Sequence, residues 1–166
     1  MRSIVALLLL FGILIGVAPR VVADPGKEEP AAREDPMYAD GVKAVKQGDY
    51  ATAIRLFQAI VARDDQNANA YNWLGYSTRQ AGDARRAVPI YQKALAIDPK
   101  HRGAHEYIGE AYLILGDLPK AREHLAVLDK LCLLPCSEYS DLKKAVQAFE
   151  TSGGRVKPTS KASPSP

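Results

Sequence analysis

Apolar and polar positions in the middle of the chain are spaced as in amphipathic helices. In the clearest stretch, Ile90, Tyr91, Ala94 and Leu95 recur at three- and four-residue steps with polar residues between them. Such spacing places the apolar side chains along one face of a helix. The pattern predicts three pairs of helices, over residues 37–47 and 50–63, 70–81 and 84–97, and 102–115 and 118–131.

A seventh helix is predicted over residues 137–150, starting at Cys136 or Ser137. Its polar side chains fall on one face, and its apolar side chains fall on the other, as expected for a helix that covers the end of a helical stack. The apolar face consists of Leu142, Ala145, Val146 and Phe149.

The helix pairs repeat with a period of 34 residues. The dipeptide Gly-Asp occurs at Gly48-Asp49, Gly82-Asp83 and Gly116-Asp117. In each pair the glycine can take the left-handed conformation that closes a helix, and the aspartate can accept hydrogen bonds from the first turn of the next helix. Three further sets keep the same step, namely Gly41, Gly75 and Gly109; Ala53, Ala87 and Ala121; and Phe57, Tyr91 and Leu125. We expect the glycines and alanines to let paired helix backbones approach closely.

This 34-residue pattern resembles the tetratricopeptide repeat, whose unit is a helix, a turn and a second helix. The resemblance implies an all-α domain over residues 37–150. Its repeats, at about residues 34–67, 68–101 and 102–135, would stack as a short right-handed superhelix with helix 137–150 as a cap. Pro89 departs from a regular helix and should bend it or cost about 3 kcal/mol.

The resemblance also implies a function, because the first helix of each tetratricopeptide unit lines a concave face that receives a peptide. The chain is therefore predicted to be an adaptor for a protein or peptide partner of unknown identity. The acidic residues on this face favour a basic partner, and the alternative for any one of the polar residues is that it is merely solvated. The matching positions are Tyr38, Val42, Val45, Asn69, Asn72, Tyr76, Arg79, Glu106, Glu110 and Leu113.

The first 23 residues are typical of a secretory signal peptide. Arg2 precedes an apolar run over residues 4–17, and Val21-Val22-Ala23 provides a cleavage site after Ala23. The predicted location is therefore periplasmic or secreted. An uncleaved membrane anchor is the less favoured alternative, because a spanning helix needs roughly 20 apolar residues.

Two polar segments flank the predicted domain. Residues 24–36 and 151–166 are rich in proline and polar side chains, which predicts a flexible N-terminal segment and a disordered tail. The formal net charge of the whole chain is +3, and loss of Arg2 and Arg20 with the signal would leave 20 basic and 19 acidic residues. A nearly neutral chain with interspersed charges argues against a nucleic-acid partner, and no membrane partner is expected after cleavage.

The two cysteines of the chain, Cys132 and Cys136, stand four residues apart. In an oxidising compartment such a pair most often forms a disulfide. Soft thiolates also suit Cu(I), so a copper or thiol-redox accessory protein is the alternative hypothesis. A third hypothesis is a structural repeat protein that self-associates weakly through the apolar ends of its stack.

Catalytic and metal-binding motifs are weak in this sequence. His101 and His105 have a helical metal-ligand spacing, but a third ligand is not evident, and structural roles are predicted for both. The sequence holds no recognisable nucleophile triad, phosphate loop or zinc-protease motif. We expect no enzyme activity, no metal and no cofactor.

Overall fold

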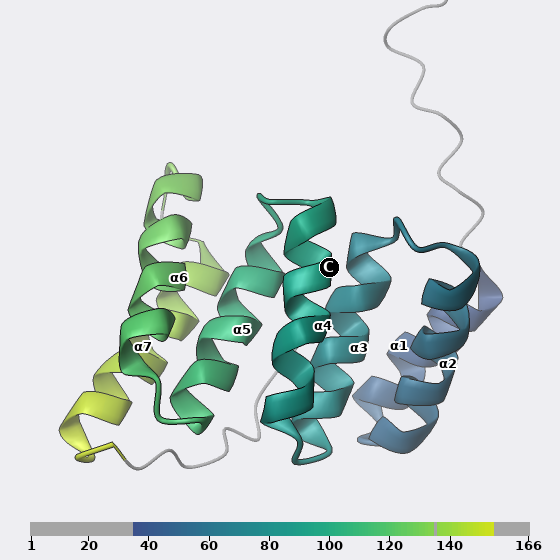
Figure 1. Ribbon diagram of the computed structural model, residues 1–166, viewed down its shortest axis with the longest axis horizontal. Helices are drawn as coiled ribbons and strands as arrows, with labels where there is room; N and C mark the ends of the chain where they lie inside the picture. The colour runs from purple at the N-terminus through teal and green to yellow at the C-terminus, as the bar shows by residue number, and fades with distance from the viewer. Residues whose placement is uncertain (1–34, 135, 155–166) are drawn as a thin grey trace, which may run out of the picture. The chain divides into compact units, whose positions relative to one another are not determined.

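The computed structural model describes residues 35–134 and 136–154, and within them the chain forms seven α-helices and no strand (Figure 1). This confirms the all-α fold, and each helix begins and ends within two residues of its predicted limit. The predicted signal peptide, and most of both predicted flexible segments, lie outside the described residues. The helices are α1 Pro36–Lys46, α2 Tyr50–Arg63, α3 Ala68–Gln80, α4 Ala84–Ile97, α5 Arg102–Ile114, α6 Leu118–Leu131 and α7 Ser137–Thr151.

The helices form three hairpins that stack side by side in chain order, and α7 packs on α5 and α6 (Figure 1). This arrangement confirms the predicted stack of repeats with a terminal helix. Asp35, Pro36 and Thr151 fall within the segments predicted to be flexible, but Asp35 caps α1, Pro36 begins it and Thr151 is the last residue of α7. None of the helices in the described part is both long and apolar enough to cross a membrane.

The Gly-Asp dipeptides act as the sequence predicts. Gly82 has a φ of 96°, in the left-handed region that a glycine adopts without steric cost. Its neighbour Asp83 begins α4, and the Asp83 side chain accepts a hydrogen bond of 2.9 Å from the Arg86 backbone N–H. The dipeptides at positions 48 and 116 repeat both features. The turn inside each hairpin is therefore fixed by local backbone chemistry.

The repeated glycines make room for side chains, which corrects the expectation of close backbone contact. A Cβ atom on Gly41 would lie 2.7 Å from the Phe57 ring, and one on Gly75 would lie 2.6 Å from the Tyr91 ring. Both rings belong to the second helix of the same hairpin and are fully buried. Glycine is needed at these two positions because the aromatic ring fills the space that any larger residue's side chain would occupy.

In the third repeat, the side chain that packs against the repeated glycine comes from a different helix. Leu125 stands at the position of Phe57 and Tyr91, but the side chain against Gly109 is that of Leu142 in α7, 2.6 Å from a Cβ built there. Leu142 is fully buried, whereas Leu125 is only partly buried. The terminal helix thus completes the packing of the last hairpin.

Aromatic rings connect the hairpins. Phe57 stacks on Trp73 at a centroid distance of 6.1 Å, and this contact joins the first repeat to the second. Tyr76 meets Tyr107 at 5.1 Å and joins the second repeat to the third. Such pairs add about 0.5–1.5 kcal/mol each to the energy of burial. One continuous core therefore runs through the stack.

Helix α4 runs from Ala84 to Ile97 with Pro89 in its interior. Pro89 is exposed and lacks the N–H group that would bond to the Arg85 carbonyl, so it weakens the helix without filling the core. We expect Pro89→Ala to raise the free energy of unfolding by about 1–2 kcal/mol, since part of the gain is offset by a more flexible unfolded chain. Urea denaturation measures the change. Pro119→Ala, in the first turn of α6, is the control and should be neutral; equal gains would refute this explanation.

Candidate functional site

The ten residues predicted to line a groove are mostly buried. Helices α1, α3 and α5 carry them, and only Asn69 is exposed, while Tyr38, Val42 and Glu110 are partly buried. The alternative interpretation, a merely solvated polar side chain, is therefore wrong for the buried Asn72, Arg79 and Glu106. The buried members are Val45, Asn72, Tyr76, Arg79, Glu106 and Leu113.

The apolar members belong to the core. Tyr76 lies between Tyr50, Trp73 and Tyr107, with ring centroids 5.1–6.4 Å apart, and burial raises the pKa of its hydroxyl. Val45 and Leu113 lie in the same cluster. Their packing role leaves the polar members as the candidates for ligand recognition.

Arg79 and Glu110 form a buried ion pair between α3 and α5. The Arg79 Nη2 and Glu110 Oε2 atoms are 2.8 Å apart, and the two side chains are 3% and 15% exposed. The guanidinium also lies over the rings of Tyr76 and Tyr107, at 5.5 and 5.6 Å, and within 3.5 Å of the Tyr91 hydroxyl. Burial raises the pKa of Glu110, and the charge of Arg79 opposes that rise.

Glu106 lies one turn before Glu110 on α5, and no described residue forms a hydrogen bond or ion pair with its carboxyl group. The residue is 7% exposed. Burial raises the pKa of Glu106 to about 9, and the carboxylates of Glu110, Asp141 and Glu138 add to the rise. The carboxyl group is therefore protonated at neutral pH. Carboxyl groups with strongly raised pKa values cluster at functional sites, so Glu106 is a candidate for ligand recognition.

Asn72 is a second buried polar residue with unused capacity. It is 3% exposed, and within the described part of the chain its Oδ1 atom has no hydrogen-bond partner. Its Nδ2 atom lies 3.2 Å from the position of a Cβ on Gly103, which precedes Glu106 by one turn of α5. An unsatisfied buried acceptor costs about 1–3 kcal/mol. We call Asn72, Arg79, Glu106 and Glu110 the polar cluster.

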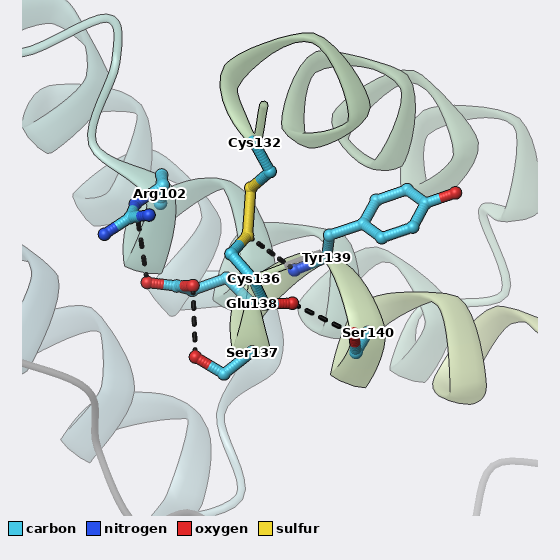
Figure 2. The surroundings of a disulfide bond; sticks show 7 residues. All are labelled: Arg102, Cys132, Cys136, Ser137, Glu138, Tyr139 and Ser140. Carbon is cyan, nitrogen blue, oxygen red and sulfur yellow. Dashed lines mark hydrogen bonds and ion pairs between the residues drawn. A yellow bond between two sulfur atoms is a disulfide. The ribbon is translucent and has the colours of Figure 1, made fainter. Parts of the chain in front are cut away.

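The loop between α6 and α7 is closed by its cysteines (Figure 2). The sulfurs of Cys132 and Cys136 are 2.02 Å apart, and the Cα atoms are 5.8 Å apart. Cys132 is the C-cap residue of α6, and Cys136 is the N-cap residue of α7. The Cys136 sulfur accepts a hydrogen bond from the Tyr139 N–H at 3.5 Å. The bond thus fixes where α7 begins, and with it the positions of the acidic residues that α7 carries.

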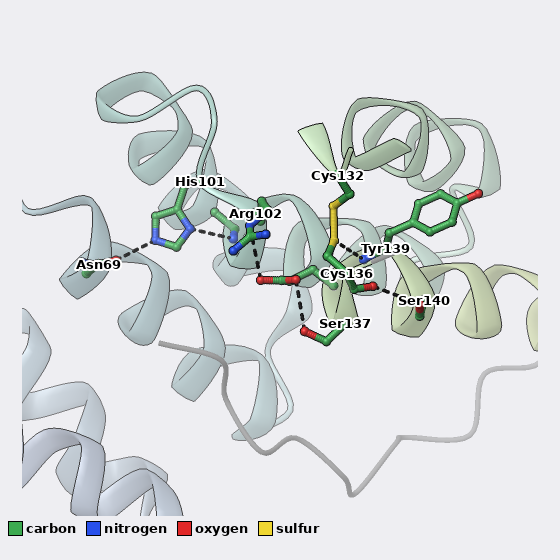
Figure 3. A network of polar contacts seen from close by, with 10 residues as sticks. Asn69, His101, Arg102, Cys132, Cys136, Ser137, Tyr139 and Ser140 are labelled. Atoms are coloured by element: carbon green, nitrogen blue, oxygen red, sulfur yellow. Dashed lines mark hydrogen bonds and ion pairs between the residues drawn. A yellow bond between two sulfur atoms is a disulfide. The ribbon is translucent and has the colours of Figure 1, made fainter. Parts of the chain in front are cut away.

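A polar network connects this loop with α3 (Figure 3). His101 caps α5 by accepting from the Ala104 N–H through Nδ1, and its Nε2–H donates to Asn69 Oδ1 at 3.0 Å. The next residue, Arg102, pairs with the buried Glu138 of α7 at 3.6 Å. Asn69 was predicted to contact a ligand, but its side chain accepts a hydrogen bond from His101 and so connects the second and third repeats.

A histidine pair links α5 and α6, and sequence reasoning did not find it. The Nδ1 atoms of His105 and His124 are 2.9 Å apart. Because the Pro99 carbonyl can only accept, His105 Nε2 donates to it at 3.0 Å, and His105 Nδ1 accepts from His124. The rings of His101 and His105, which have the helical metal-ligand spacing, are thus held by different partners.

Burial, together with the neighbouring His105, lowers the pKa of His124 to about 4. An unfolded chain has the ordinary value of about 6.5 and takes up a proton first as the pH falls. We expect the contribution of His124 to stability to be complete above pH 6.5 and to decrease by about 2–3 kcal/mol down to pH 4. Thermal unfolding measured along this range checks the decrease. His124→Asn keeps a neutral donor, and the same pH slope in that variant would contradict the prediction.

These features define the chain as a helical repeat protein with a polar cluster between the first helices of its second and third repeats. Two family models described as "Tetratricopeptide repeat" match it, one over residues 38–101 and the other over residues 79–131. The chain therefore contains tetratricopeptide repeats. No curated protein matches the sequence.

Solved structures share the fold at low sequence identity. PcrH in complex with the chaperone binding region of PopD is 21% identical, with a TM-score of 0.64 and coverage of 71% of this chain and 91% of PcrH. The type III secretion chaperone SycD of Yersinia enterocolitica, in complex with a YopD peptide, is 21% identical with a TM-score of 0.61. The match covers 70% of this chain and 88% of SycD. The second tetratricopeptide domain of human RPAP3, in complex with the HSP70 peptide SGPTIEEVD, is 21% identical with a TM-score of 0.61. The match covers 67% of this chain and 92% of the RPAP3 domain.

Proposed function

We propose that this protein is an adaptor that binds a segment of another protein on the face formed by α1, α3 and α5. The unpaired Oδ1 of the buried Asn72 carries the proposal. An asparagine side chain has the donor and acceptor of a peptide group, so it can pair with the backbone of a bound segment. PcrH, SycD and RPAP3 hold peptides of partner proteins, which supports the same kind of role here.

The proposed role is binding without catalysis. The polar cluster consists of two carboxyl groups, one guanidinium and one amide. Its members come from α3 of the second repeat and α5 of the third, so a ligand bound there can contact both repeats. Tetratricopeptide arrays use this surface for protein recognition, and the fold of the chain supports that use.

A single substitution separates binding from stability. We expect Asn72→Leu to abolish capture of the partner and to leave the free energy of unfolding unchanged or about 1 kcal/mol higher, since it removes an unsatisfied acceptor. Cross-linked capture from the native host, with urea denaturation in parallel, measures both. Lys93→Met, on the exposed side of α4, is the matched control. Equal capture by the two variants would remove Asn72 from the binding site.

We also propose that the protein is exported, with cleavage after Ala23, into an oxidising compartment where the Cys132–Cys136 bond persists. A mature N-terminus at residue 24, determined by mass spectrometry, tests the export. Free thiols in the exported protein would instead favour the copper or thiol-redox hypothesis, and a concentration-dependent mass in light scattering would favour self-association.

The disulfide is expected to stabilise the end of the stack modestly. For a ring of this length, the loop-entropy model gives about 2 kcal/mol. The Cys132→Ser, Cys136→Ser double variant should lose about that much in urea denaturation. The oxidised and reduced forms of the natural chain should differ by the same amount, and a negligible difference would assign the cysteines another role.

A further inference from the structure

Glu106 and Asn72 are the two members of the polar cluster whose acceptor oxygens form no hydrogen bond with any described residue. We propose that they bind one cationic side chain, a lysine ammonium or an arginine guanidinium, of the segment held on this face. This inference rests on the proposed function and names the ligand chemistry of the same site. Glu106 supplies the charge that the cation needs, and Asn72 Oδ1 supplies a second acceptor.

The ion pair within the cluster makes Glu106 the carboxyl that remains free. Glu110 is already matched by Arg79, with 2.8 Å between Nη2 and Oε2. Glu106, one turn away on the same face of α5, has no such partner among the described residues. Glu106 is therefore the carboxyl group of the cluster that can ionise to meet a ligand cation, and the site should take one cation and not two.

The charged groups that face Glu106 leave its carboxyl group without a cationic partner. Glu110 lies on the same helix, Arg79 reaches in from α3, and Glu138 and Asp141 approach from α7. Each of these three carboxyl groups has a cation of its own, namely Arg79 for Glu110, Arg102 for Glu138 and Lys144 for Asp141. Ionised Glu106 is therefore the carboxylate left to attract an arriving positive charge. RPAP3, in contrast, holds a peptide ending in EEVD. The two proteins should therefore select ligands of opposite charge.

Asn72 fits the donors of such a ligand. An ammonium group has three donors and no acceptor, so a carboxylate alone leaves donors unpaired in a buried site. Asn72 Oδ1 is a buried acceptor with no partner among the residues that the structure describes, and Asn72 lies beside Gly103, one turn before Glu106. The small size of Gly103 leaves the space that the Asn72 side chain occupies. Helices α3 and α5 thus each contribute one acceptor.

Binding of a cation should change the protonation of Glu106. Burial raises the pKa of Glu106 to about 9, so its carboxyl group carries a proton at pH 7.5. A bound cation stabilises the carboxylate, and the proton is released to solvent. The affinity should therefore increase as the pH rises from about 7 to 9, and each bound ligand should release close to one proton at pH 7.5.

Synthetic octapeptides test the inference on the full mature chain. The probes carry neutral residues at seven positions and lysine, norleucine or glutamate at one central position, and their binding is measured by isothermal titration calorimetry. We expect the best lysine peptide to bind at least about ten-fold more tightly than its norleucine form. Titrations in buffers of different ionisation enthalpy should show release of about one proton. Glu106→Gln should remove both the preference and the release, whereas Glu123→Gln, exposed on α6, should keep them.

The outcomes separate this inference from the proposed function. Peptides that bind equally well with lysine and norleucine, and lose binding in Asn72→Leu, would overturn the cation site and support the adaptor. A preference for glutamate, or a lysine preference that persists in Glu106→Gln, would overturn the assignment to Glu106. Absence of binding by every peptide, while the captured partner still binds away from α3 and α5, would overturn both.

Discussion

Replacement of Arg79 by leucine is expected to lower the free energy of unfolding by about 3–5 kcal/mol at neutral pH. Arg79 is the positive partner of Glu110 at 2.8 Å and lies over two tyrosine rings. Its loss leaves a buried carboxylate without compensation, next to Glu106. Urea denaturation at pH 7.5 and pH 5 measures the effect. The loss should be smaller at pH 5, because burial raises the pKa of Glu110 and protonation then removes the unpaired charge.

The double variant Arg79→Leu, Glu110→Leu is the control for this prediction. Replacing both ions by apolar groups removes the unpaired charge, and buried pairs replaced in this way often lose little stability. We expect the double variant to recover more than half of the loss of the single one. Equal losses in the two variants would mean that Arg79 acts through packing alone.

Gly75→Leu is expected to lower the free energy of unfolding by about 3 kcal/mol or more, because the added side chain must displace a buried ring. A Cβ atom alone would lie 2.6 Å from Tyr91, which is fully buried. Gly75→Ala should already lose about 1–2 kcal/mol, although alanine is the better helix former. Thermal and urea denaturation measure the series.

Gly103→Ala is the matched control, since it adds the same methyl group to a helical glycine whose nearest neighbour is the end of a side chain and not a buried ring. The nearest atom to a Cβ there is Asn72 Nδ2 at 3.2 Å, at the end of a side chain. We expect a neutral or slightly stabilising change. If Gly75→Ala also increased stability, the Tyr91 ring would not require a glycine at position 75, and the explanation of how the hairpins pack would be contradicted.

The sequence predicted the helices because their limits depend on local chemistry. Asp49, Asp83 and Asp117 accept hydrogen bonds from the first turns that follow them, and a glycine with positive φ precedes each one. Such caps act over a few residues, so the 34-residue period was sufficient to place every hairpin. The partner of Gly109 could not be read in this way, because Leu142 comes from a helix outside the repeat pattern.

The candidate site was predicted only in part. The repeat register located Asn72, Arg79, Glu106 and Glu110, but it gave no indication that they are buried or that Arg79 lies between tyrosine rings. Burial and ion pairing depend on contacts between α3, α5 and α7, which are distant in sequence. The register of α7 offered one signal, since Glu138 precedes Leu142 by one turn and therefore shares its face.

Site-specific photo-crosslinking tests the central claim most directly. A photoreactive amino acid replaces Asn69, exposed on α3, in one form of the protein and Lys93, exposed on α4, in another. If the face formed by α1, α3 and α5 receives the partner, the form labelled at position 69 will yield a crosslinked partner and the form labelled at position 93 will not. A partner crosslinked from position 93 alone would place recognition on the opposite helices and contradict the account.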